Sequence, residues 1–143
     1  MKFPSNDREI LPQSTKPTHY DLRFEPDIEG GATEYDSEVI INLDVLEDTS
    51  LISLNATELT IIETQLATEG GQLVEISGLK FEPEKEWMSI ALKTASKASS
   101  KAKLKQTFKG SLFHHAQGFF RSPHKGIDGK DTWIFSTQME NGC

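Results

Sequence analysis

Apolar and polar residues alternate with a period of two through most of the chain, and this pattern predicts β-strands. Tyr20, Leu22 and Phe24 alternate with charged or polar neighbours, which predicts a strand with one buried and one solvated face. The clearest strand is predicted over residues 33–46. The apolar residues on its predicted buried face are Val39, Ile41, Leu43 and Val45.

Shorter segments of the same kind follow, separated by turn signals such as Gly70-Gly71. Strands are predicted at residues 51–55, 59–66 and 73–76 and, after a polar turn at 83–86, around Met88, Ile90 and Leu92. The alanines of 94–103 have helical spacing, but no large apolar residue accompanies them. A loop is therefore favoured there over a helix.

The last predicted strand covers residues 132–140 and follows a turn at 126–129. Its odd positions include the apolar residues Trp133, Phe135 and Met139, whereas the even positions Ser136, Gln138 and Glu140 share the opposite face. Many short strands without a confident helix indicate an all-β fold, either a sandwich or saddle-like antiparallel sheets. At 143 residues the chain has room for one domain, which an extended arm at 1–16 precedes.

Charge is distributed unevenly along the chain. Residues 1–92 carry 19 acidic and 6 basic side chains, whereas residues 93–143 carry 3 and 9, so the two parts attract each other. Around the lysines of 93–109 only Phe108 could stack on a base, so nucleic acid is not an expected partner. Because Ala102, Leu104 and Phe108 alternate with lysines, the solvated face of a strand is the favoured interpretation.

Cysteine content and the first residues bear on the compartment. Cys143 is the only cysteine, which rules out an internal disulfide and favours a reducing, cytoplasmic setting. Residues 1–10 contain four charged side chains and no apolar run. Neither a secretory signal nor a membrane span is expected, and the membrane is not an expected partner.

Candidate catalytic groups are few. The histidines at 19, 114, 115 and 124 do not show metal-ligand spacing, so no metal site is predicted, and adjacent His114 and His115 are best explained by a surface loop. No serine or cysteine has the setting of a nucleophile, and no glycine-rich phosphate loop occurs. Taken alone, Gln138 and Glu140 fit the solvated face of a strand.

Several blocks of the sequence nevertheless resemble one family. These blocks are Leu11-Pro12, Lys16–Leu22, Glu25-Pro26-Asp27, Ile52–Ala56, Gly118–Ser122 and Phe135–Glu140. Together they are similar to the aminopeptidase N / puromycin-sensitive aminopeptidase family of zinc metallopeptidases, especially to fungal members. Because the blocks keep the family's order over nearly the whole chain, the match is specific.

The resemblance implies that residues 17–140 form most of an N-terminal β-domain that lends a thermolysin-like catalytic domain one edge of its substrate pocket. In the family a Thr-Gln-x-Glu strand helps hold the free α-amine of the substrate, which assigns substrate binding to Gln138 and Glu140. Its implied partners are the N-terminus of a peptide and the catalytic domain of the parent enzyme. Zinc is implied for the complete parent enzyme, and no cofactor for this chain.

The sequence departs from the family at its end. Residues 141–143 replace the proline and the segments that usually follow, which makes them a divergent tail and leaves the β-domain incomplete at its C-terminal end. The zinc-binding helix and the exopeptidase motif do not occur, so this chain alone is expected to be inactive. The alternative function is a free-standing, non-catalytic β-sandwich that binds a peptide or a protein.

Overall fold

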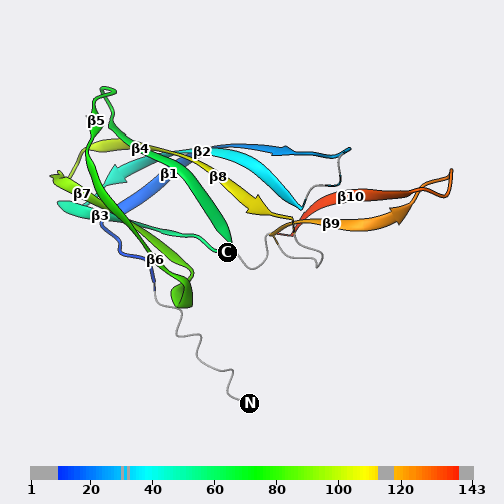
Figure 1. Ribbon diagram of the computed structural model, residues 1–143. Coiled ribbons are helices and arrows are strands. Elements are labelled where there is room, and N and C mark those ends of the chain that lie inside the picture. Colours follow the sequence, from blue (N-terminus) through cyan, green and yellow to red (C-terminus); the bar gives the residue numbers. More distant parts are fainter. Residues whose placement is uncertain (1–9, 30, 32, 113–117, 139–143) are drawn as a thin grey trace, which may run out of the picture. The chain divides into compact units, whose positions relative to one another are not determined.

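In the computed structural model, the described residues are 10–29, 31, 33–112 and 118–138, and they form strands with one short 3₁₀ helix (Figure 1). The strands are β1 (Thr15–Pro26), β2 (Glu34–Val45), β3 (Thr49–Asn55), β4 (Leu59–Thr68), β5 (Leu73–Val74), β6 (Ile76–Glu82), β7 (Trp87–Ser96), β8 (Lys101–Ser111), β9 (Gly118–Lys125) and β10 (Asp131–Gln138). The 3₁₀ helix, η1, covers Pro83–Lys85. The predicted all-β fold class is confirmed.

The strands are arranged in three sheets. Five strands form a sheet in the order β1-β2-β8-β4-β5, three form a sheet in the order β3-β7-β6, and β9 pairs with β10. The pairs β3/β7, β6/β7, β4/β5 and β9/β10 are antiparallel. No helix among the described residues is long and apolar enough to cross a membrane.

The chain divides into two compact units. Unit 1 comprises Met1–Asp21, Ile40–Thr57 and Thr64–Lys105, and unit 2 comprises Leu22–Val39, Glu58–Glu63 and Gln106–Cys143. The strands β1, β2, β4 and β8 each contribute residues to both units. The three-stranded sheet belongs to unit 1, whereas β9 and β10 belong to unit 2.

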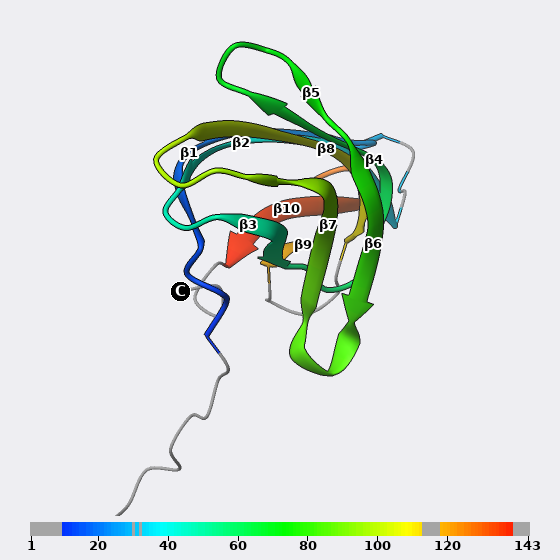
Figure 2. The ribbon, with the colours of Figure 1, turned by 90° about the vertical axis from the view of Figure 1, so that its left-hand side faces the viewer.

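The core of unit 1 follows the alternation of the sequence. Figure 2 shows β3, β7 and β6 as a layer distinct from the strands of the five-stranded sheet. Each layer contributes apolar side chains that are at most 7% exposed. These are Ile41, Leu43, Val45, Leu66, Ala102 and Leu104 from the five-stranded sheet and Ile52, Met88, Ile90 and Leu92 from the three-stranded one. Burial of these side chains is the main stabilisation of the unit.

The lysines of β8 lie on the solvated face, as predicted. Along β8, Ala102, Leu104 and Phe108 are buried, whereas Lys101 and Lys103 are exposed. The neighbouring strand in the sheet is β2, whose outward side chains are largely acidic. In unit 2, Lys109 Nζ lies 2.8 Å from Asp36 Oδ1. Acidic side chains of β2 and basic side chains of β8 thus lie on neighbouring strands of one sheet.

Strand β1 forms as predicted, but its apolar face is not buried along its length. Tyr20 is 55% exposed and Leu22 50%, whereas Phe24 is half-buried. β1 is also an edge strand of the five-stranded sheet. Alternation predicts which side chains share a face, but it does not predict whether another layer covers that face.

Two other predictions need correction. Residues 73–76 do not form one strand, because β5 ends at Val74 and β6 continues from Ile76 to Glu82. Strand β6 was not predicted from the alternation of apolar and polar residues, because its register shifts between Ile76 and Gly78 and interrupts that alternation. The segment 94–103 is not helical, as predicted, but the loop is shorter than expected, since β7 ends at Ser96 and β8 begins at Lys101.

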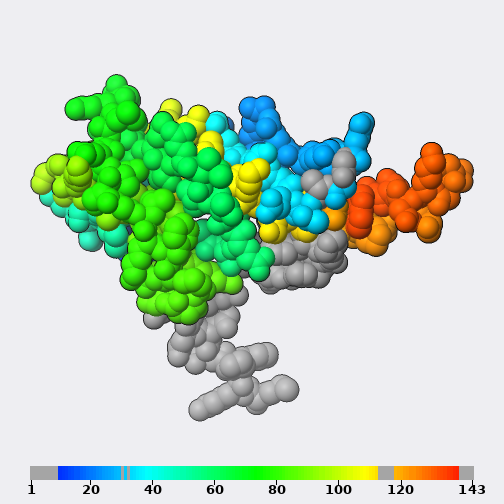
Figure 3. Space-filling view, viewed as in Figure 1, coloured from blue at the N-terminus to red at the C-terminus, as the bar shows by residue number. Residues whose placement is uncertain are grey.

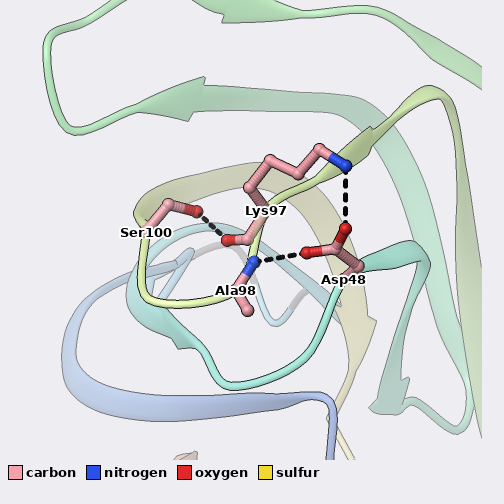
Figure 4. A network of polar contacts seen from close by, with 4 residues as sticks. All are labelled: Asp48, Lys97, Ala98 and Ser100. Atoms are coloured by element: carbon pink, nitrogen blue, oxygen red, sulfur yellow. Dashed lines mark hydrogen bonds and ion pairs between the residues drawn. The ribbon is translucent and has the colours of Figure 1, made fainter.

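The short loop between β7 and β8 is held by the carboxylate of Asp48 in unit 1 (Figure 4). Asp48 accepts a hydrogen bond of 2.8 Å from the backbone N–H of Ala98, and Lys97 Nζ lies 2.7 Å from its second oxygen. Ser99 adopts a left-handed conformation with φ of 64°, and its N–H donates to the carbonyl of Val45 at 2.8 Å. The hydrogen bond from Lys97, then that from Ala98, lowers the pKa of the Asp48 carboxyl.

This arrangement predicts a pH dependence of stability. Because the pKa of Asp48 is lowered in the folded state, its contribution is present above the unfolded value of about 4 and is lost as the pH falls through the folded value. We expect Asp48→Asn, measured by urea unfolding, to destabilise the chain at pH 6 and to differ less from the wild type as the pH approaches 3. Lys97→Met should behave in the same way. A difference that stays constant from pH 6 to pH 3 would contradict the assignment.

Candidate functional site

Strands β9 and β10 form a hairpin within unit 2. Their register pairs Asp131 with Lys125 at the turn end and Gln138 with Gly118 at the other end. The turn closes through a hydrogen bond of 2.9 Å from the N–H of Gly126 to the carbonyl of Lys130, as expected for the predicted turn. Lys125 Nζ lies 2.6 Å from Asp131 Oδ1 beside it. Figure 3 shows the atoms of this hairpin in orange and red.

The register divides the hairpin into two faces, because residues directly opposite each other in an antiparallel pair project to the same side. One face, here called the aromatic face, carries Phe119, Arg121, Pro123, Trp133, Phe135 and Thr137. The other, here called the glutamine face, carries Gly118, Phe120, Ser122, His124, Thr132, Ile134, Ser136 and Gln138. The predicted sharing of one face by Ser136 and Gln138 is confirmed.

The aromatic face packs against other strands of unit 2. The ring centroid of Phe119 lies 5.2 Å from that of Phe24 in β1 and 5.1 Å from that of Tyr35 in β2. Phe24 and Tyr35 are 5.4 Å apart in an edge-to-face arrangement, and Phe135 lies 6.3 Å from Phe119. These distances lie in the range in which aromatic pairs attract beyond their burial. The four rings, here called the aromatic cluster, join β1, β2, β9 and β10.

Arg121 extends this packing along the hairpin. Its side chain is buried, with 4% exposure, and its Nη1 donates a hydrogen bond of 2.6 Å to the carbonyl oxygen of Gly31. The guanidinium carbon lies 4.0 Å from the centroid of the Trp133 ring, a cation–π arrangement across the two strands. Gly31 has a φ of 67°, a backbone conformation that favours glycine. Arg121 therefore ties the hairpin to the β1–β2 connection.

Gln138 is the last residue of β10, and its side chain is exposed on the glutamine face. Its opposite residue is Gly118, which contributes no side chain to this face. Glu140, the second predicted substrate-binding residue, lies outside the described residues, as do Met139, His114, His115 and the tail at 141–143. The structure therefore describes one half of the predicted pair.

The described residues do not provide a metal-binding group. In that part of the chain, no three histidine, cysteine or acidic side chains lie close enough together to hold an ion. The donor set of a zinc site does not fit what these residues offer, and we assign none of them to zinc.

The described residues form an all-β domain in which β10 ends at an exposed glutamine. Comparison of sequences identifies the family: residues 16–142 match the model of the peptidase M1 N-terminal domain. The chain belongs to this family.

Individual relatives agree with this assignment. "Aminopeptidase 2" of Candida albicans is 33% identical over 134 residues, which are 94% of this chain and 14% of the relative. "Puromycin-sensitive aminopeptidase" of Caenorhabditis elegans is 28% identical over 93% of this chain and 14% of its own length. "Alanine/arginine aminopeptidase" of Saccharomyces cerevisiae is 28% identical over 93% of this chain and 15% of its own length. The chain thus spans about one seventh of the length of these relatives.

Sequence reasoning missed two features of the hairpin. The alternation of Trp133 and Phe135 indicated β10, but β9 was noticed only as a family block, because Gly118–Ser122 does not alternate in polarity. The burial of Arg121 was also missed, because arginine is rarely buried without a partner and its sequence neighbours do not indicate one. The signal that could have found it is the presence of Trp133 on the neighbouring strand, because tryptophan is a preferred partner of guanidinium groups.

Gly110 of β8 lies next to Tyr35, one of the rings of the aromatic cluster. A methyl group at this position would lie 2.3 Å from the Tyr35 ring, which is 9% exposed and held by Phe24 and Phe119. We expect Gly110→Ala to force the ring out of place and to destabilise the chain by about 1–3 kcal/mol in urea unfolding.

Gly78→Ala in β6 is the matched control, because nothing lies within 4 Å of the added methyl group. It should change stability by less than about 0.5 kcal/mol. When Tyr35 is replaced by leucine, adding Gly110→Ala should lower the free energy of unfolding much less than it does in the wild type. An equal cost of Gly110→Ala with tyrosine and with leucine at position 35 would show that the ring contact is not its cause.

Proposed function

We propose that this chain is the N-terminal β-domain of a zinc aminopeptidase that removes residues from the N-terminus of peptides, and that Gln138 and Glu140 help to bind the α-amine of the substrate. The single observation that supports this role is the position of Gln138 at the exposed end of β10, in a chain that belongs to the peptidase M1 N-terminal domain family. The names of the relatives support the activity.

The chemistry of the two side chains fits an ammonium group. The amide oxygen of Gln138 can accept a hydrogen bond from it, and a glutamate carboxylate supplies the opposite charge. The period of two in the sequence of residues 132–140 predicts that Glu140 shares a face with Gln138. Two acceptors about 7 Å apart along the strand would then lie on either side of a bound amine.

The rest of the machinery is proposed to come from elsewhere in a complete enzyme. This domain would contribute one edge of the substrate site, and the catalytic domain of the parent enzyme would hold the zinc ion, which would activate water for attack on the peptide bond. A cytoplasmic location is part of the proposal, supported by the lack of any cysteine other than Cys143.

A free-standing, non-catalytic β-domain that binds a peptide or a protein is the second candidate function. The specific observation in its favour is the exposed glutamine face, which does not need a catalytic domain to be accessible to a partner. Sequencing the transcript beyond the codon for Glu140 distinguishes the two. A reading frame that continues into a zinc-binding helix favours the peptidase, and a stop codon in abundant transcript favours the free-standing module.

The role of the two side chains is tested in the complete enzyme. Glu140→Ala should lower kcat/KM on peptides with a free N-terminus at least about tenfold, because truncating one partner of a desolvated charge pair typically costs about 2–5 kcal/mol. Gln138→Ala should cost less, because it removes a neutral hydrogen bond. The measurement is steady-state hydrolysis of an aminoacyl anilide by folded, zinc-loaded protein.

Thr137→Ala is the control, because Thr137 directly precedes Gln138 in β10 but projects to the aromatic face. It should leave kcat/KM within about twofold of the wild type. The isolated chain is expected to bind no zinc and to hydrolyse no anilide. Wild-type kcat/KM in folded Glu140→Ala enzyme would refute the assigned role and leave the glutamine face as an ordinary solvated surface.

A further inference from the structure

We propose that Phe120 is a specificity-determining residue, whose ring forms the wall against which the side chain of the substrate's first residue packs. This inference rests on the proposed binding of the α-amine near Gln138 and adds the chemical class of the residue that is removed. An aromatic wall at this point favours peptides that begin with a large apolar residue.

Register places Phe120 beside the proposed amine site. Gln138 pairs with Gly118, and Ser136 pairs with Phe120, so Phe120 and Gln138 are diagonal neighbours on the glutamine face. Diagonal neighbours in an antiparallel pair are about 7–8 Å apart, a separation that aromatic and long side chains can bridge. A ligand group held by Gln138 therefore lies within reach of the Phe120 ring.

Phe119 projects to the aromatic face, whereas Phe120 projects to the glutamine face, where a ligand could contact it. Phe119 belongs to the aromatic cluster, where it lies 5.2 Å from Phe24 and 5.1 Å from Tyr35. Its chain neighbour must project to the other face, because side chains alternate along a strand. The ring of Phe120 is half-buried there, so part of its apolar surface remains in contact with solvent. Covering that surface with an apolar ligand side chain would be favourable.

Position 118, between Gln138 and Phe120 on this face, is a glycine. It faces Gln138 directly, has a φ of 61°, and lies two residues before Phe120 in the same strand. It therefore adds no side chain between Gln138 and Phe120. The α-amine and the side chain of an amino acid leave the same carbon atom, so a residue bound by its amine at Gln138 can direct its side chain over Gly118 toward Phe120.

The experiment compares leucyl and alanyl anilides as substrates of the complete, zinc-loaded enzyme. The readout is the ratio of the two kcat/KM values, because this ratio reports contacts with the side chain of the first residue and cancels effects on the amine. Phe120→Ala should lower the leucine-to-alanine ratio by about tenfold, since even one methylene in an apolar pocket can be worth that much.

Phe120→Trp is the second variant, in case the alanine variant does not fold. A larger ring on the exposed face should occupy the space over Gly118, lowering kcat/KM for leucyl anilide at least about fivefold and for alanyl anilide by less than about twofold. Thr132→Ala is the matched control, because Thr132 is exposed on the same face but lies opposite His124, about 13 Å along the strands from the Phe120 pair and about 20 Å from Gln138. It should leave the ratio unchanged.

The outcomes separate this inference from the proposed function. An unchanged ratio in both Phe120 variants, or an equal loss on both substrates, would overturn the role of Phe120 even if Gln138→Ala impairs the enzyme. A lower leucine-to-alanine ratio in the Phe120 variants supports the contact of Phe120 with the side chain of the first residue. This holds also if Gln138→Ala and Glu140→Ala have no effect. In that last case only the assignment of the amine-binding residues fails.

Discussion

The arrangement of unit 2 depends on the packing of one ring, that of Phe119, against Phe24, Tyr35 and Phe135. Phe24 and Tyr35 belong to strands of the five-stranded sheet, whereas Phe119 and Phe135 belong to the hairpin of β9 and β10. An isolated two-stranded hairpin is at best marginally stable in water, so β9 and β10 need such a contact to remain in place. Packing of the aromatic face supplies it, and the buried Arg121 adds a charged hydrogen bond to the Gly31 carbonyl.

Orientation of the hairpin follows from this packing. Because side chains alternate, burying Phe119 and Phe135 on one face requires Phe120 and Gln138 to project to the other. A shift of the register by one residue would expose the rings and bury the polar groups, which makes this register strongly preferred. The features that give the hairpin its stability thus also determine which side chains can meet a ligand.

How much of this the sequence predicts depends on the range of the interactions. Periodicity predicts strands such as β2, whose residues Val39 to Val45 alternate regularly, and it places Ser136 and Gln138 on one face. Burial of whole faces is harder to predict, as the half-exposed Tyr20 in the edge strand β1 shows. Contacts across the fold, such as that of Gly110 with Tyr35, leave no local signal, because they depend on strands 75 residues apart in sequence. For Gln138 and Glu140 the residues alone favoured a solvated face, and only the family resemblance indicated a binding role.

Amide hydrogen exchange in Phe119→Ala tests most directly whether the aromatic cluster holds the hairpin. The account predicts that amides of β9 and β10, including those of Phe135 and Gln138, lose at least about tenfold in protection, which corresponds to about 1.4 kcal/mol. Amides of β7, which belongs to unit 1, should keep their wild-type protection. Unchanged protection across β9 and β10 in Phe119→Ala would contradict the account, because the orientation of the glutamine face would then have another cause.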